Sequence, residues 1–171
     1  ISALLPAGAL VCDPLMEATG ILHSKHTLVV IPDSPVLGEY RQEFAGLIGT
    51  LQEHPSEGPD DTPGFAGSSK ISGTDKLKKH LEKNPKNKVD AKAYLKARLM
   101  DLLLNDKDRH PKQWRWARYP DGKEYIWIPI PEDRDQAFIS LDGFAMAVIR
   151  RAVPSQIKFE EELPSLVGLS L

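Results

Sequence analysis

The chain has 171 residues, 41% of them hydrophobic, which is enough for one packed domain of mixed class or for two small lobes. Its 22 basic and 24 acidic side chains give a formal charge of -2, so nucleic acid and anionic membranes are not expected as partners. No window is apolar over the roughly 18 residues that a transmembrane helix needs. The single cysteine, Cys12, lies in an apolar run and is expected to be an inert core thiol.

Residues 1–54 predict a small unit of one helix and two strands. Residues 5–22 favour a helix with a break at Pro14 and a left-handed cap at Gly20. The apolar, β-branched run 26–32 predicts a strand, and 44–55 predicts a second, weaker one. The chain starts with Ile rather than Met, so we expect it to be a piece of a longer polypeptide.

Residues 55–70 are rich in Pro, Gly, Ser and Asp, and they predict a linker or a long surface loop before a second unit, residues 71–171. That unit is expected to open with a short basic helix capped by Thr74 and to close with a helix around 142–152.

The clearest helix prediction runs from about 91 to 104. Asp90 has the position of an N-cap, and Val89 and Tyr94 have the spacing of a hydrophobic staple around it. Four leucines recur at helical spacing, so the helix is expected to bury this stripe. The stripe consists of Leu95, Leu99, Leu102 and Leu103.

A β-hairpin is predicted at 113–130, with strands at about 113–119 and 124–130. Asp121-Gly122 between them is typical of a two-residue turn. This turn sets Trp116 opposite Trp127, Arg118 opposite Tyr125 and Trp114 opposite Pro129. One face is then aromatic, and such a face is more often core than a ligand platform. It consists of Trp114, Trp116, Tyr125 and Trp127.

The hairpin joins two acidic segments, "NDKDRHPKQW" at 105–114 and "PEDRDQAF" at 131–138. Extending the register to the open end of the hairpin brings Asp108 toward Asp135 and Gln113 beside Ile130. We therefore expect the two segments to face each other within reach of a side chain. Phosphoryl transfer needs such an arrangement: a carboxylate to orient the attacking hydroxyl, an amide a few residues later, and a metal-binding carboxylate nearby.

The stretch "DRHPKQ" resembles the D-R-H-x-x-N catalytic loop of atypical kinases related to the HipA and CotH families and to the type II phosphatidylinositol kinases. "EDRDQAF" is similar to their D-x-D-x-x-F or D-N-G-x-A-F metal-binding segment. The resemblance covers about residues 74–140, including the helix before the loop and the hairpin between the motifs. It implies an α+β, kinase-like fold with a helical C-lobe, preceded by part of an N-lobe.

By this resemblance, Asp108 is the catalytic base, and Arg109 and His110 shape its loop. Gln113, Asp133 and Asp135 are the expected magnesium ligands. The implied cofactors are Mg²⁺ and ATP, the implied partners a nucleotide and an unknown phosphoryl acceptor.

In the N-lobe-like part, Glu17 or Asp13 is the candidate partner of a phosphate-binding lysine. The whole chain also resembles an uncharacterised region of envelope-associated bacterial proteins, which implies work outside the cytoplasm or at the outer membrane.

The chain departs from the kinase pattern in two ways. Gln113 replaces Asn, and its additional methylene fits magnesium geometry less well. The first seventy residues contain no Gly-rich loop followed by a strand with Lys. Those parts either precede Ile1 in a longer protein, or the domain is a pseudokinase.

Two other interpretations stay open. A metal-dependent hydrolase would use the acidic residues and the histidine of both segments as ligands. A non-catalytic interaction domain would use the same carboxylates only as helix-end caps and as ion-pair partners of Arg109, Arg115 or Arg134. The hydrolase ligands would be Asp106, Asp108, His110, Asp133 and Asp135.

Overall fold

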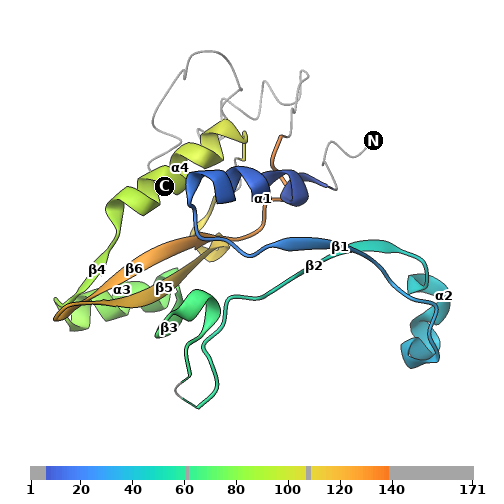
Figure 1. Ribbon diagram of the computed structural model, residues 1–171, viewed down its shortest axis with the longest axis horizontal. Helices are drawn as coiled ribbons and strands as arrows, with labels where there is room; N and C mark the ends of the chain where they lie inside the picture. Colours follow the sequence, from blue (N-terminus) through green and yellow to red (C-terminus); the bar gives the residue numbers. More distant parts are fainter. Residues whose placement is uncertain (1–6, 61, 107–108, 139–171) are drawn as a thin grey trace.

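The computed structural model describes residues 7–60, 62–106 and 109–138. The described chain mixes helices with two antiparallel or mixed sheets, which confirms the α+β class (Figure 1). The elements are α1 (Gly8–Thr19), β1 (His26–Val30), α2 (Arg41–Phe44), β2 (Ile48–Gln52), β3 (Lys70–Gly73), α3 (Thr74–Lys83), β4 (Asn87–Val89), α4 (Ala91–Leu103), β5 (Trp114–Asp121) and β6 (Glu124–Pro131), with 3₁₀ turns at Pro35–Tyr40, Phe65–Gly67 and Pro111–Gln113.

The main sheet has the strand order β3-β5-β6-β4. The predicted hairpin, β5 and β6, forms its centre, β3 pairs antiparallel with β5, and β4 pairs parallel with β6. The strands β3 and β4 were not predicted from the sequence. Each has only three or four residues, which is too short for a hydrophobic period to be visible.

The hairpin register differs from the prediction because the turn lies at Gly122-Lys123 rather than Asp121-Gly122. Asp121 pairs with Glu124, so Trp116 lies opposite Pro129 instead of Trp127. Gly122 has a φ of 60°. A positive φ at the first central position suits a type II′ turn, for which glycine is the preferred residue.

The aromatic face of the hairpin is core, as predicted. Trp114, Trp116 and Trp127 are buried in one cluster with residues of α1, α3 and α4. The rings of Trp114 and Trp116 lie 5.2 and 5.6 Å from that of Tyr94 on α4. Helix α1 and helix α4 cover this face side by side (Figure 1).

The leucine stripe of α4 does not face the core, so that prediction was wrong. Leu95, Leu99 and Leu103 are 55 to 62% exposed, whereas Ala97 and Met100 are buried. The small side chain of Ala97 permits a close approach to the other core elements. The polar contacts of Asp101, described below, favour the same rotation of the helix.

The helix ends agree with the sequence in part. Gly20 is the left-handed C-cap of α1, which continues through Pro14 without the expected break. Asp90 caps α4 by accepting a bond from the Ala93 amide. Thr74 is not a cap: it is the first residue of α3, and Gly73 precedes it.

The strands β1 and β2 pair with each other and extend away from the main sheet as a two-stranded arm (Figure 1). Both are shorter than predicted. The arm and its tip expose many apolar side chains, which is unusual for a ribbon of two strands. They include Leu28, Val30, Val36, Tyr40, Phe44, Leu47, Ile48 and Leu51.

Residues 55–60 and 62–69 form a surface loop with internal hydrogen bonds rather than an extended linker. The amide of Phe65 donates to Ser56 over 3.0 Å, and the amide of Gly64 to Ser68 over 2.8 Å. The Phe65 side chain is buried against the outer face of the main sheet with Ile71 and Ala117. The loop is thereby fastened to the second unit.

No helix in the described part of the chain is long and apolar enough to cross a membrane. The helix predicted around 142–152 lies outside the described residues. The division into two lobes stays a prediction. Helix α1 of the first unit shares its hydrophobic core with elements of the second.

Cys12 tests the packing of α1. Its side chain is fully buried, and burial raises the pKa of its thiol to about 11. At pH 8 we expect iodoacetamide to alkylate the folded protein at least roughly a hundredfold more slowly than the urea-unfolded chain, because little thiolate forms. Mass spectrometry over a time course measures both rates, and equal rates would contradict this packing.

Candidate functional site

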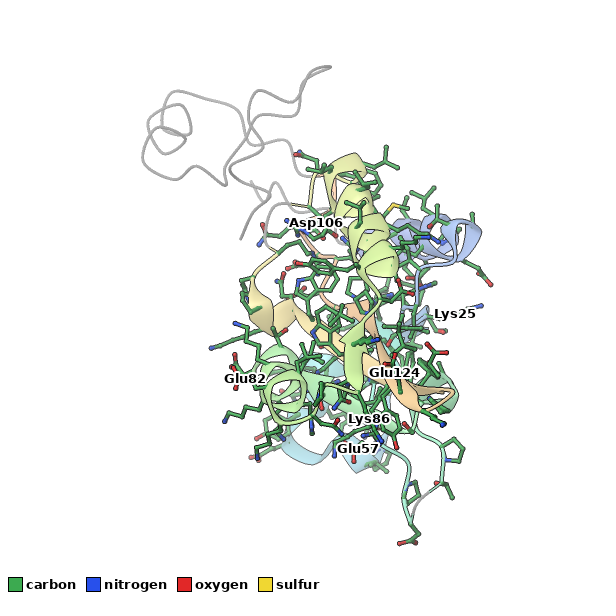
Figure 2. The ribbon with its side chains drawn as sticks, turned by 90° about the vertical axis from the view of Figure 1, so that its left-hand side faces the viewer. Lys25, Glu57, Glu82, Lys86, Asp106 and Glu124 are labelled. Atoms are coloured by element: carbon green, nitrogen blue, oxygen red, sulfur yellow. The ribbon has the colours of Figure 1, made fainter. Side chains whose placement is uncertain are left out.

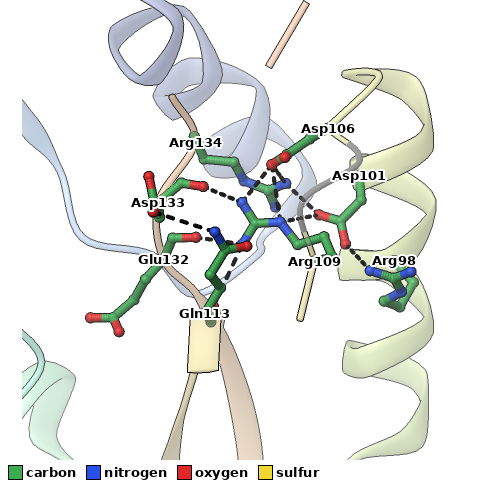
Figure 3. Close-up of polar contacts among 8 residues, drawn as sticks. All are labelled: Arg98, Asp101, Asp106, Arg109, Gln113, Glu132, Asp133 and Arg134. Carbon is green, nitrogen blue, oxygen red and sulfur yellow. Dashed lines mark hydrogen bonds and ion pairs between the residues drawn. The ribbon is translucent and has the colours of Figure 1, made fainter. Parts of the chain in front are cut away.

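The two motif segments meet at the open end of the hairpin, as predicted from the sequence (Figure 3). The guanidinium group of Arg109 donates to the main-chain carbonyls of Glu132 and Asp133. The Gln113 amide nitrogen donates to Asp133 Oδ2 over 3.3 Å. The Glu132 amide in turn donates to the Gln113 carbonyl over 2.9 Å, so that main chain and side chains both join the segments.

Buried ion pairs connect this junction to α4. Arg109 Nε lies 3.0 Å from Asp106 Oδ2, and Arg134 Nη1 lies 2.8 Å from the same oxygen. Arg134 also donates to Asp101 Oδ1, and Arg98 Nη1 donates to Asp101 Oδ2 over 2.7 Å. We call Asp101, Asp106, Arg109 and Arg134 the aspartate-arginine network. Figure 2 shows Asp106 within the body of the protein near the end of α4.

All four members of the network are buried, with at most 6% of each residue exposed. Burial raises the pKa of Asp101, and the neighbouring Arg134, Arg109 and Arg98 oppose that rise. An arginine cannot lose its proton in a protein, so each buried guanidinium requires a carboxylate or carbonyl partner. The network therefore fixes the relative positions of α4, the 109–113 loop and the segment after β6.

Asp106 is thus not the cap of a solvated helix end, which was one interpretation of its sequence context. Asp101 was missed altogether, since it lies outside both motifs and within a run of leucines. A charged residue in such an apolar run is the only signal that could have indicated a buried ion pair.

Asp133 and Asp135 differ from the network because both side chains are exposed. They line an open cavity of about 350 Å³ together with Glu132 and Arg134. The lining also includes His26, Thr50 and Gln52 of the arm and the nearby His54. The cavity thus lies between the β1–β2 arm and the second motif, and we call it the motif cavity.

Asp133 has a backbone φ of 58°. A left-handed conformation is uncommon outside glycine, and such residues gather at functional sites when surrounding contacts hold them. Here the holding contacts come from Arg109 and Gln113.

Among the other described candidates, His110, Glu17 and Asp13 make local contacts of their own. His110 is exposed, and its Nδ1 accepts a bond from the Lys112 amide at the start of the 3₁₀ turn. Glu17 is exposed and pairs with Lys25, whereas Asp13 accepts bonds from the main chain and ring of His26 and so fixes the start of β1. Asp108 lies outside the described residues.

Among residues 7–60, 62–106 and 109–138, no three His, Cys, Asp or Glu side chains gather closely enough to hold a metal ion. Of the three expected magnesium ligands, Asp133 and Gln113 already touch through their side chains, and Asp135 lines the motif cavity beside Asp133. Carboxylate and amide oxygens are ligands that Mg²⁺ accepts, usually together with water and substrate phosphates.

No family model matches the chain, and no curated protein or solved structure is significantly similar to it. The functional argument therefore depends on the geometry of the site itself.

Replacing Asp106 by Ala tests the network. The change leaves Arg109 and Arg134 buried without one of the two carboxylates that they share, so we expect a loss of about 3–5 kcal/mol in the free energy of unfolding. Urea denaturation followed by tryptophan fluorescence measures it.

The matched control is Asp33→Ala, since Asp33 pairs with Arg41 at the surface and its loss should cost about 0–1 kcal/mol. Equal effects of the two substitutions would contradict a supporting role for the network.

Proposed function

We propose that the chain is an atypical kinase-like domain that binds a magnesium nucleotide in the motif cavity, as a phosphotransferase or as a pseudokinase. The observation that carries the proposal is that the two motifs bury their arginines but expose two of their carboxylates. Their arginines are buried in the network, whereas the carboxylates of Asp133 and Asp135 face an open cavity.

The size and position of the motif cavity support this proposal. Its volume of about 350 Å³ lies within the range of small-molecule sites. It lies between the arm and the hairpin, and kinase-like folds bind nucleotides between a small β-rich lobe and a helical lobe. In that comparison the arm corresponds to N-lobe strands, and Glu17 on α1 to the partner of a phosphate-binding lysine.

The second motif would hold the metal. Asp133 is the principal proposed ligand, since its carboxylate is exposed in the motif cavity while its main chain is fixed by Arg109. Asp135 lines the same cavity two residues later. Gln113 presents its amide nitrogen to Asp133, so the amide would rotate to offer its oxygen to an ion there.

The first motif would serve the acceptor. Asp108 is the proposed base for the acceptor hydroxyl, and Arg109 keeps the following loop against the second motif. His110, which is exposed and caps the 3₁₀ turn, would shape the loop rather than take part in the chemistry.

The test is the substitution Asp133→Ala. We expect Mg-ATP to raise the melting temperature of the native protein and to leave that of the variant unchanged, because the principal carboxylate for the ion is gone. Differential scanning fluorimetry with and without Mg²⁺ measures both.

Asp121→Ala is the control, since Asp121 lies at the far end of the hairpin and should retain the full shift. If Mg-ATP still raises the melting temperature of Asp133→Ala, the assignment of Asp133 to the metal site is wrong.

A second candidate function is a non-catalytic interaction domain. Arg109 and Arg134 donate to buried carboxylate and carbonyl oxygens. These bonds alone explain why the two motifs contact each other, which favours this second function. In that case Mg-ATP produces no thermal shift even in the native protein, while Asp106→Ala still lowers the free energy of unfolding.

A further inference from the structure

The far end of the β1–β2 arm exposes apolar side chains to water. We call residues 33–47 the arm tip; they include the 3₁₀ turn Pro35–Tyr40 and helix α2 (Figure 1). None of these residues is buried, and none belongs to a hydrophobic core cluster of the described chain. Four large side chains are between 42 and 93% exposed, namely Val36, Tyr40, Phe44 and Leu47.

Helix α4 exposes a second apolar surface. Leu95, Leu99 and Leu103 recur at helical spacing on the side of the helix that faces away from the core, and they are 55 to 62% exposed. A helix of a globular protein normally buries such a stripe, and large exposed apolar patches mark interaction sites. We call this surface the α4 face; it consists of Ala91, Lys92, Leu95, Lys96, Leu99 and Leu103.

The arm tip has a net negative charge. Asp33 pairs with Arg41, whereas Glu39 and Glu43 have no cationic group within ion-pair distance in the described structure. Negative charge beside the apolar side chains disfavours a membrane as the partner, because the carboxylates and anionic lipid headgroups repel each other. It favours a surface that is apolar and positively charged.

The α4 face has that composition. Lys92 and Lys96 are its only charged residues, and neither has a carboxylate within ion-pair distance among the residues described. Lys96 Nζ donates to the neutral carbonyl of Thr19 over 2.9 Å, so its charge is uncompensated. The arm tip lies far from α4 of its own chain, because the arm extends away from the main sheet (Figure 1). The contact therefore requires a second copy.

The area of the two surfaces suits a symmetric dimer. At roughly 100 Å² per side chain, the four large side chains of the arm tip and the three leucines of the α4 face bury about 700 Å² in one contact. Stable interfaces bury about 1,200–2,000 Å². One contact is too small, whereas two equivalent contacts about a two-fold axis reach about 1,400 Å².

We propose that two copies of this chain form a closed dimer in which the arm tip of each copy packs on the α4 face of the other. Tyr40 and Phe44, whose rings lie edge to face 6.1 Å apart, anchor the contact, since aromatic residues are enriched at the centre of interfaces. The two carboxylates of the tip lie beside the two lysines of the face and set its orientation. The contact also stabilises the arm, because an isolated ribbon of two strands is marginally stable in water.

This inference does not depend on the proposed function. Neither the arm tip nor the α4 face shares a residue with the lining of the motif cavity. Asp133→Ala should therefore dimerise as the native chain does, even if its response to Mg-ATP is lost.

The experiment is analytical ultracentrifugation of the 171-residue chain over a wide range of protein concentration. We expect a reversible equilibrium between monomer and dimer. Val36→Lys at the tip and Leu99→Lys on the α4 face should each weaken dimerisation at least about tenfold, because each places an ammonium group in an apolar contact. Both native side chains are exposed in the monomer, so the fold is expected to persist, and circular dichroism checks it.

Leu51→Lys is the matched control, because Leu51 is an equally exposed apolar residue of the arm that lies outside both surfaces. It should leave dimerisation unchanged. Equal losses in Leu51→Lys and Val36→Lys, or a native chain that stays monomeric at every concentration, would overturn the inference.

Charge reversal tests the pairing of the two surfaces. One variant carries Glu39→Lys and Glu43→Lys, and the other carries Lys92→Glu and Lys96→Glu. Each alone sets like charges against each other in both contacts and should dimerise weakly. An equimolar mixture should form heterodimers of nearly native stability, because one contact is then native and the other has both signs exchanged. A mixture that associates no better than its components would contradict the proposed pairing.

Two other outcomes would assign the arm tip differently and so overturn the proposal. Growth into open chains instead of a dimer would exclude the closed two-fold arrangement. A monomeric chain that floats with phosphatidylcholine vesicles, and loses this binding in Val36→Lys, would assign the arm tip to a membrane surface.

Discussion

The buried pairing of Asp101 and Asp106 with Arg109 and Arg134 is the constraint on which the rest of the structure depends. Two guanidinium groups are fully enclosed here, and an enclosed positive charge without a partner costs several kcal/mol. The chain meets this requirement by drawing the end of α4, the loop after it and the segment after β6 to one point (Figure 3). The hairpin supplies the two segments, and the network determines how they meet.

Within the two motifs, the charges of the network are buried and those of the second motif's aspartates are exposed. Arg109 and Arg134 lie within the two motifs, yet the Arg109 guanidinium and Nη1 of Arg134 donate to buried oxygens. The exposed carboxylates of Asp133 and Asp135 stand at the motif cavity instead. Buried, hydrogen-bonded supports that hold exposed ligands are the usual construction of a binding site, because they limit the movement of the ligand groups.

The same constraint explains which face of α4 is inside. Asp101 must face Arg134 and Arg109, and Ala97 and Met100, four and one residues before it, turn inward with it. Leu95, Leu99 and Leu103 are then left on the outside. A hydrophobic stripe alone predicts burial correctly only when no stronger requirement sets the rotation of the helix, and a buried ion pair is such a requirement.

The sequence by itself determined the features that depend on local chemistry. A glycine at a positive φ ends α1, an aspartate accepts the first amide of α4, and a glycine turn between β-forming runs closes the hairpin and brings the two motifs together. Tertiary structure alone decided the inward face of α4 and the engagement of the motif arginines. Both depend on partners distant in sequence, such as Asp101 for Arg134, whose mutual burial no local pattern encodes.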